Sequence, residues 1–349
     1  MTGVIAGALL QSARRTTGLT QEDLAEAAGV AVDTVKRWEN GQRPLGHVKA
    51  ASLVQLQRCL RRQGARPALV TRLPLAVDAD DFVTRAVSGD CSRLGSEVTV
   101  RAWSSLVAWA AAGRPPAEAG DVAPGHALLT VPQRAALFTS IREAAVRPGT
   151  GGLLLRHQAY YLAGLDTSAE GAAWLADAAR AEASRLRLDG SWSPDWVAAR
   201  SLAIAAACQG DPGQLHWFLT RHMEDRGECA EANLSYWAYW AGSDPEPAAD
   251  EDFMIRRRMD PQRGAVLLQH FTASLSPELP YADLSAASAR SLLQRWPDLL
   301  GRDRQLASDL AARAGQMLDQ AALTPGARAQ LSDLHVSARA AAPRSRRST

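Results

Sequence analysis

The amino-acid sequence predicts an all-α protein, with a small helical domain at the amino terminus followed by a large α-helical bundle or an irregular α-solenoid. Leu and Ala recur at spacings of three and four residues along most of the 349-residue chain, as they do in helices that bury one face. The breaks between these runs carry turn residues, for example Gly113-Arg114-Pro115-Pro116 and Gly210-Asp211-Pro212-Gly213. No alternating apolar runs typical of strands stand out.

The pattern of residues 20–41 predicts two short helices joined by a tight turn. Thr20 can cap a helix that begins directly after it, with Asp23 answering three residues later as in a capping box. Ala25 must be small, because a second helix crosses close above it. Gly29 permits the positive φ that a tight turn between helices needs.

The second of these helices has one apolar face and one polar face. Val30, Val35 and Trp38 supply the apolar side of the turn and of the helix. The residues that repeat at helical spacing and are left pointing outward are Val32, Asp33, Lys36 and Arg37. Two amphipathic helices with a polar outer face are what a protein that reads the DNA major groove requires.

The segment resembles the lambda-repressor-like (XRE) helix-turn-helix family. The resemblance is carried by Gly18-Leu19-Thr20-Gln21, Leu24-Ala25, Gly29-Val30 and Trp38-Glu39-Asn40-Gly41. It would cover roughly residues 4–66, and it implies a five-helix bundle whose third helix enters the major groove, usually as a dimer on a two-fold site. Ala31 departs from the Ser or Thr that usually caps the recognition helix. After Pro44, a longer Arg-rich helix ending near Arg62 replaces the usual short one.

The outward residues of the second helix are the candidate base contacts. We expect Arg37 to make a bidentate contact with a guanine edge and Lys36 to contact a phosphate or a base, against the alternative of a solvated helix face. Asp33 either accepts a hydrogen bond from a cytosine or holds the Arg37 guanidinium in place. Val32 either touches a thymine methyl group or packs at the helix end, and Thr34 can face either way.

Three further residues complete the candidate DNA-binding set. Gln21 opens the first helix of the motif, and the family resemblance implies that its side chain and the free amides there grip a phosphate. Asn40 belongs to the closing motif, and Arg43 is placed for a phosphate on the other side of the groove. Trp38 is expected to pack in the core.

The charge is concentrated at the amino terminus. The whole chain has a net charge of +2, but residues 1–66 hold ten basic and five acidic residues, and the remainder holds 29 basic and 32 acidic ones. We call residues 1–66 the head and the helical remainder the body. A basic head on a mildly acidic body fits a protein in which only the head contacts DNA phosphates. The charge distribution therefore favours double-stranded DNA as a partner, and the family resemblance implies a second copy of the chain.

Cysteine usage and hydropathy predict a cytoplasmic protein without membrane contact, and the expected DNA binding adds association with the nucleoid. The four widely spaced cysteines, which are expected to be reduced and mostly buried, are Cys59, Cys91, Cys208 and Cys229. The apolar residues 3–10 follow no basic residue and fit the first helix of the head better than a signal peptide. The uncharged stretches are too short to span a bilayer.

Beyond the helix-turn-helix domain, expected at residues 1–66, the sequence predicts a linker and one helical body. Residues 67–80, with Pro67, Pro74 and little helical period, are expected to form the linker. Residues 81–342 form the body, and residues 343–349 a disordered basic tail. Helices within the body are expected at 98–112, 133–146, 153–164, 169–187, 195–209, 213–225, 228–241, 252–275, 283–298, 302–319 and 325–341.

No motif in the body indicates catalysis, so we expect no enzyme, no metal and no cofactor. The aromatic cluster Tyr236-Trp237-Ala238-Tyr239-Trp240 either lines a ligand pocket or packs between helices, and packing is the favoured interpretation. The spacings of His216, His222 and Cys229 match no zinc pattern. Gly149-Thr150-Gly151-Gly152 lacks the Gly-Lys-Ser/Thr ending of a phosphate-binding loop.

The main functional hypothesis is a transcription regulator that binds a two-fold operator as a homodimer. Its helical body would dimerise and sense a small-molecule or protein effector. The alternative is a protein-interaction scaffold or antitoxin-like module, in which the DNA-binding head serves autoregulation.

Overall fold

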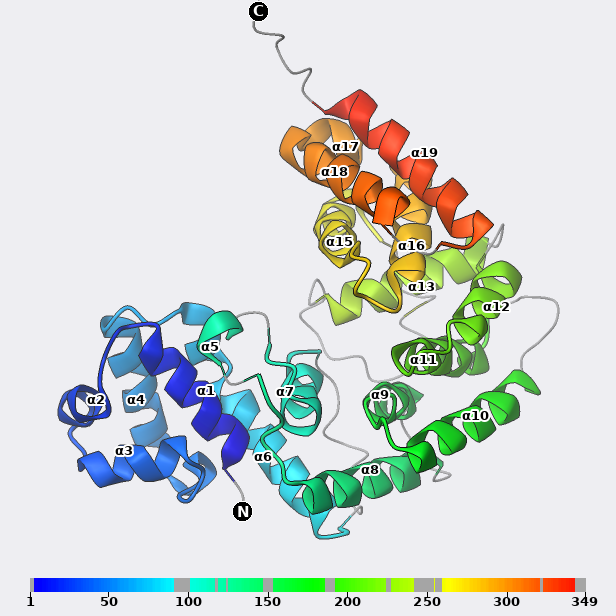
Figure 1. The fold of residues 1–349 in the computed structure, drawn as a ribbon. Coiled ribbons are helices and arrows are strands. Elements are labelled where there is room, and N and C mark those ends of the chain that lie inside the picture. Colours follow the sequence, from blue (N-terminus) through cyan, green and yellow to red (C-terminus); the bar gives the residue numbers. More distant parts are fainter. Residues whose placement is uncertain are drawn as a thin grey trace, which may run out of the picture. The chain divides into compact units, whose positions relative to one another are not determined.

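The computed structural model describes residues 3–90, 101–116, 119–123, 125–146, 153–185, 192–223, 227–241, 254, 259–320 and 323–342 (Figure 1). All regular elements within these ranges are helices, as the sequence predicts. Contacts divide the chain into two compact units, Met1–Asp166 and Thr167–Thr349. Each unit is described by itself.

The first unit contains the predicted helix-turn-helix and the helices that support it. Its first half consists of α1 (Val4–Arg15), α2 (Gln21–Ala28), α3 (Val32–Glu39), a short 3₁₀ helix (Leu45–His47), α4 (Ala50–Arg62) and α5 (Pro67–Thr71). Its second half consists of α6 (Leu73–Val87), α7 (Arg101–Ala112), a 3₁₀ helix (Gly120–Val122), α8 (Val131–Val146) and α9 (Leu153–Ala163). The long α4 ends at Arg62, where the sequence predicts it to end.

Residues 67–80 are helical, which corrects the expectation of a linker there. Pro67 lies at the start of α5 and Pro74 at the start of α6. Backbone N–H groups in the first turn of a helix have no acceptor within the helix, so the missing N–H of proline costs nothing there, and its fixed φ suits the helix. Leu69, Val70 and Leu73 are fully buried. The prolines therefore mark two helix starts, and the fifth helix of the head lies beyond the expected boundary at residue 66.

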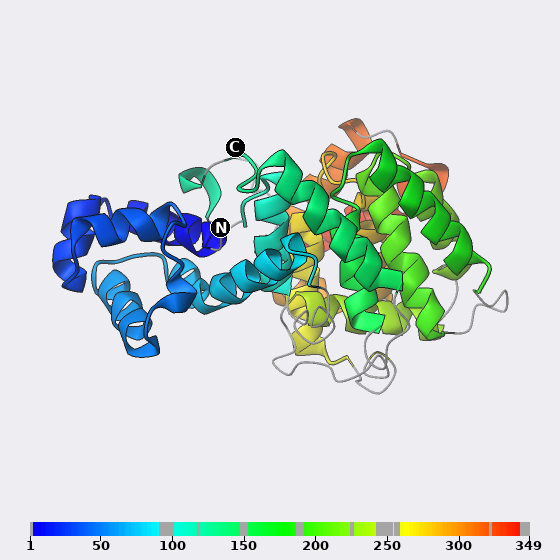
Figure 2. The ribbon, with the colours of Figure 1, turned by 90° about the horizontal axis from the view of Figure 1, so that it is seen from below.

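The helix α6 connects the head to the rest of the first unit. It packs against α1 at one end and against α7 and α8, and Figures 1 and 2 both show this cyan helix running from the blue helices toward the green ones. The hydroxyl of Ser140 on α8 donates to the carbonyl of Ala86 at 2.6 Å. Arg142 and Asp166 form a buried ion pair at 2.6 Å that joins α8 to the chain after α9. Residues 81–166 therefore belong with the head, although the sequence places them in one body with residues 167–342.

The second unit is built from successive helices, several of which pack on their neighbours in the chain. They are α10 (Ala169–Ala183), α11 (Pro194–Cys208), α12 (Gly213–His222), α13 (Gly227–Trp240), α15 (Pro261–Ser274), α16 (Ala282–Arg295), α17 (Leu299–Arg302), α18 (Arg304–Gln320) and α19 (Pro325–Ala341). The pairs α11–α12, α15–α16 and α18–α19 pack as expected for short connections. The helix α16 also packs on α13 and α19, so it lies inside this unit.

Most helices of the body match their expected positions closely. Helices are expected at 153–164, 195–209 and 325–341, and the structure has them at 153–163, 194–208 and 325–341. The short helix α17 is not predicted, and α15 begins only at Pro261, where Asp260 accepts hydrogen bonds from the amides of Gln262 and Arg263. The expected tail, residues 343–349, lies outside the described residues.

Candidate nucleic-acid interface

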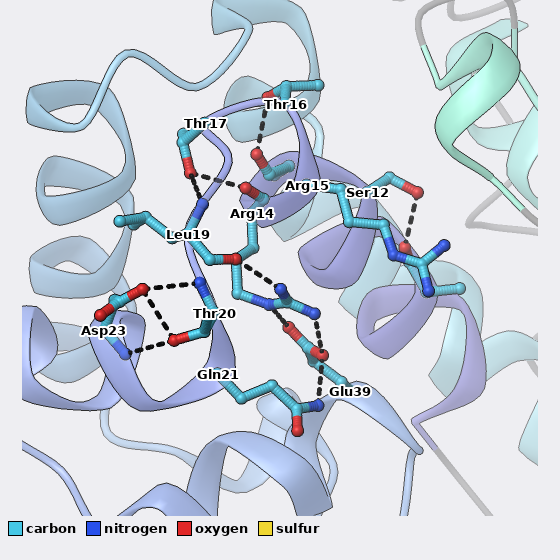
Figure 3. Close-up of polar contacts among 12 residues, drawn as sticks. Ser12, Arg14, Arg15, Thr16, Thr17, Leu19, Thr20, Gln21, Asp23 and Glu39 are labelled. Carbon is cyan, nitrogen blue, oxygen red and sulfur yellow. Dashed lines mark hydrogen bonds and ion pairs between the residues drawn. The ribbon is translucent and has the colours of Figure 1, made fainter.

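The helix-turn-helix has the predicted cap (Figure 3), and it also has the predicted turn. The Asp23 amide donates to the Thr20 hydroxyl at 3.1 Å, and the Asp23 carboxylate accepts from the Thr20 amide at 2.8 Å, which completes a capping box. The hydrogen bonds from the Thr20 side chain and backbone lower the pKa of Asp23. Gly29 has φ +68°, which L side chains adopt at a cost, so the turn requires glycine. Ala25 is buried, as the close crossing of α2 and α3 demands.

A second close approach, between α1 and α3, involves Gly7. A Cβ at Gly7 would lie 2.7 Å from the carbonyl oxygen of Glu39 and nearer still to that of Trp38. Because both atoms belong to backbone, neither can move aside without shifting α3. The carboxyl end of α3 is thus pressed directly onto α1.

A buried polar network joins α1, α2 and α3 (Figure 3). The Arg14 guanidinium donates to both carboxylate oxygens of Glu39, at 2.6 Å from Nε and 2.9 Å from Nη2. Its Nη1 donates to the carbonyl of Leu19 at 2.6 Å. Gln21 donates from Nε2 to Glu39 at 2.7 Å. Since bidentate arginine–carboxylate pairs fix both distance and orientation, Glu39 sets the position of α3 on the two preceding helices.

The outer face of α3 carries the residues that the sequence assigns to it. Val35 and Trp38 are buried on the inner side of the helix. Asp33, Lys36 and Arg37 are exposed, while Val32 and Thr34 are half-buried at the start of the helix. An eight-residue helix is about 12 Å long, close to the width of the major groove of B-DNA.

Both basic residues of this face are paired with exposed acidic residues. The Arg37 Nε lies 2.8 Å from the Asp33 carboxylate one helical turn earlier, and the Lys36 Nζ lies 3.8 Å from the carboxylate of Glu22 on α2. In the chain without DNA, the Asp33 carboxylate therefore contacts Arg37. Exposed pairs of this kind contribute roughly 0–1 kcal/mol, so DNA can replace the acidic partner at little cost.

The remaining candidates lie at the two ends of α3 and at the start of α2. Gln21 is half-buried, and one N–H of its amide is engaged by Glu39, which leaves the other for a phosphate. Asn40 is exposed and accepts a hydrogen bond from the Gln42 amide at 3.1 Å. The exposed Arg43 is fixed beside α3, because its amide donates to the Arg37 carbonyl at 3.0 Å.

The start of the helix α3 has no side-chain cap. Ala31 lies at its N-cap with φ −69° and ψ 145°, and an alanine side chain cannot accept a hydrogen bond.

The start of α1 is capped by a residue far away in the sequence. The two carboxylate oxygens of Asp80 on α6 accept from the amides of Ile5 and Ala6 at 2.9 Å each. Burial raises the pKa of Asp80 to about 6, although the hydrogen bonds from these amides oppose the rise.

The supporting residues Arg14, Glu39 and Asp80 are missing from the sequence-based set. Arg14 and Glu39 are 25 positions apart and Asp80 is 74 positions from Ala6, so no local spacing reveals these contacts. One signal was present for Glu39, because the closing motif of the family resemblance contains it. Its role is to position the recognition helix.

The metal and phosphate-loop candidates in the body gain no support as sites. Among the described residues, no three His, Cys, Asp or Glu side chains are grouped so as to hold a metal ion. Tyr236, Trp237 and Tyr239 are buried and Trp240 half-buried, which fits packing between helices. The loop at residues 149–152 and Cys91 lie outside the described residues. Cys59 and Cys229 are buried and Cys208 half-buried. Within the described ranges, no helix is long and apolar enough to cross a membrane.

Comparison with known families identifies one domain. Residues 5–73 match the family described as a helix-turn-helix domain. The match confirms the helix-turn-helix, is consistent with the lambda-repressor-like type, and ends at Leu73, the first residue of α6. Comparison with curated proteins and with solved structures gives no match to the chain. The domain indicates DNA binding and transcription regulation, and domains of this family typically carry no catalytic activity.

Proposed function

We propose that this protein is a sequence-specific transcription regulator that inserts α3 into the major groove. The observation that carries the proposal is the exposed row Asp33, Lys36 and Arg37 on a helix that a buried ion pair fixes in place. Arg37 reads a guanine edge, for which its planar fork is suited, and Asp33 holds that fork ready. Lys36 contacts a phosphate or a base. Val32 and Thr34 contact bases at the start of the helix.

Phosphate contacts position the head on the duplex. Gln21 and the capped start of α2 face one strand, and Asn40 and Arg43, beyond the end of α3, face the other. These contacts supply most of the affinity and make it depend on salt.

A homodimer supplies the affinity that one head lacks. A single short helix buries too little surface for tight operator binding, whereas two heads one DNA turn apart double the contacts on a two-fold site. The helices after the head serve dimerisation and the sensing of an effector.

Two arginine variants test the assignment of the reading face. A cognate duplex is first selected in vitro with the full chain. Arg37→Ala should then lose roughly 1–3 kcal/mol on the cognate duplex and little on a scrambled one. Arg43→Ala should weaken both duplexes alike and reduce the salt slope by about 0.9. Arg304→Ala, exposed at the start of α18, is the matched control and should change neither.

Fluorescence anisotropy at two salt concentrations separates these outcomes. An equal loss on both duplexes for Arg37→Ala would make Arg37 a phosphate anchor and reject the proposed reading face. Failure of the full chain to select any duplex would reject the function itself.

A further inference from the structure

The second unit contains a fully buried guanidinium that no acidic residue among the described ones neutralises. Arg200 on α11 is 2% exposed, and within the described part of the chain no carboxylate lies within ion-pair distance of it. The two other buried arginines that the structure describes, Arg14 and Arg142, each form an ion pair with a buried acidic residue. Burying a charge without an opposite charge costs several kcal/mol, so an arginine in this position calls for an explanation.

The groups around Arg200 compensate the burial of its charge and of its hydrogen-bond donors only in part. Its Nε donates to the side-chain oxygen of Asn233 on α13 at 2.9 Å. The guanidinium carbon lies 4.5 Å from the ring centre of Tyr236 and 4.8 Å from that of Trp237, which are distances of cation–π contacts. Its Nη2 is buried and has no hydrogen-bond partner in the described structure. The charged fork therefore keeps donors that face no acceptor.

A second unpartnered polar group lies on the helix that faces this cluster. Asn233 donates to the hydroxyl of Ser288 on α16 at 2.8 Å, which places this side of α16 against the Arg200 cluster. Ser285 lies one turn before Ser288 and Tyr281 one turn before Ser285, so the three share a face. The Tyr281 ring lies 6.5 Å from that of Trp237. The Ser285 hydroxyl is buried and has no partner in the described structure.

We propose that Arg200 is the anion-binding group of a ligand site between α11, α13 and α16, and that the ligand is a small organic monocarboxylate. A carboxylate accepts two parallel hydrogen bonds from a guanidinium fork and a further one from a hydroxyl such as that of Ser285. Arg200 is the only buried arginine in the described part of the second unit, so a monoanion balances the charge and a phosphate dianion does not. The rings of Tyr236 and Trp237 suit a ligand with an apolar or aromatic body.

Because Arg200 is covered, a ligand reaches it only when α16 and the aromatic side chains of α13 move. Binding is therefore coupled to a rearrangement of these helices, and the liganded arrangement is favoured by its differential affinity for the anion. This coupling is what an effector-sensing unit requires. The regulatory meaning of the site, though not the site itself, rests on the proposed function.

Benzoate and its neutral counterpart benzamide test the site on the full chain by isothermal titration calorimetry without DNA. The unmodified protein should bind benzoate, and benzamide about ten- to a hundredfold more weakly, because hydrogen bonds to a charged group are lost. Arg200→Met should lose affinity for benzoate by a similar factor. Arg295→Met is the matched control: Arg295 also stacks on an aromatic ring, that of Trp296 at 5.0 Å, but it is exposed and paired with Glu231. It should bind benzoate like the unmodified protein.

Ser285→Ala keeps the test decisive if Arg200→Met does not fold. It removes one unpartnered hydroxyl and should weaken benzoate about fivefold while leaving the melting temperature of the free protein unchanged. Absence of benzoate binding, or equal affinities for benzoate and benzamide, would overturn the site. Operator affinity measured by anisotropy with and without benzoate is a separate readout. A chain that binds benzoate but no DNA keeps the site and loses the proposed function.

Discussion

Replacing Glu39 by Ala should loosen the recognition helix without replacing any residue that is proposed to face DNA. The Glu39 side chain is 2% exposed and the Arg14 side chain 10% exposed, and the bidentate pair between them is the main polar tie between α1 and α3. The variant leaves the Arg14 guanidinium buried with only the Leu19 carbonyl as acceptor, and it removes the acceptor of Gln21.

The expected magnitude follows from this burial. Removing one partner of a buried ion pair costs about 3–5 kcal/mol, because the other charge stays buried and uncompensated. A loss of about 3 kcal/mol corresponds to a more than hundredfold increase in the population of the opened head. The exposed pair of Lys36 with Glu22, at 3.8 Å, should by contrast contribute roughly 0–1 kcal/mol. Glu22→Ala is therefore the matched control.

Hydrogen exchange followed by mass spectrometry measures this loss in the full chain, because it reports the opening of α1 and α3 separately from the other helices. Amides of these helices should exchange about a hundredfold faster or more in Glu39→Ala and nearly unchanged in Glu22→Ala. The double variant with Arg14→Met and Glu39→Leu should recover most of the protection, since the charge that lacks a partner is gone. Equal exchange in the two single variants would refute the view that this pair positions α3.

Three further changes should affect the head in different directions. Gly7→Ala should lower its melting temperature, because the added Cβ meets the backbone of α3, whereas Gly301→Ala in α17 meets nothing within 4 Å and should not. Ala31→Ser should stabilise the head by about 0.5–1 kcal/mol, because it adds the missing cap to α3 at a residue whose backbone is already extended; unchanged melting would show that no cap forms. Burial raises the pKa of Asp80 to about 6 from 3.8. Between these two pH values the folded head keeps a proton on Asp80 that the unfolded chain has released. Relative to Asp80→Asn, the unmodified protein should thus lose up to about 3 kcal/mol of stability as the pH rises from 4 to 7, and parallel stability curves for the two proteins would contradict this.

The local parts of the fold could be predicted from the sequence because their causes are local. The capping box of Thr20 and Asp23, the turn at Gly29 and the polar face of α3 each follow from residues within one or two helical turns. The helices of the body follow from the spacing of Leu and Ala. The sequence does not indicate α5 and α6, because Pro67 and Pro74 are typical of a break between helices, although proline is equally common in the first turn of a helix.

The supporting contacts could not be predicted because they depend on packing between distant segments. Arg14 and Arg200 each lie in a helix rich in apolar and small residues. Nothing in the neighbouring sequence shows that Arg14 has a carboxylate partner whereas Arg200 has none among the described residues. Burial distinguishes them, and burial depends on which helices meet. The sequence could therefore identify the candidate DNA-contacting face, whereas the residues that hold it in place came from the structure.

The carboxylate of Asp80 at the start of α1 has a consequence for the choice of operator. Asp80 on α6 binds the first turn of α1, and α6 also packs against α7 and α8. The head is therefore joined to these helices by packing and hydrogen bonds, and not by a flexible linker. In a dimer formed through α7 and α8 of the first unit, the distance between the two recognition helices would be fixed by the packing of that unit. Such a protein selects its sites by the number of base pairs between half-sites as well as by their sequence.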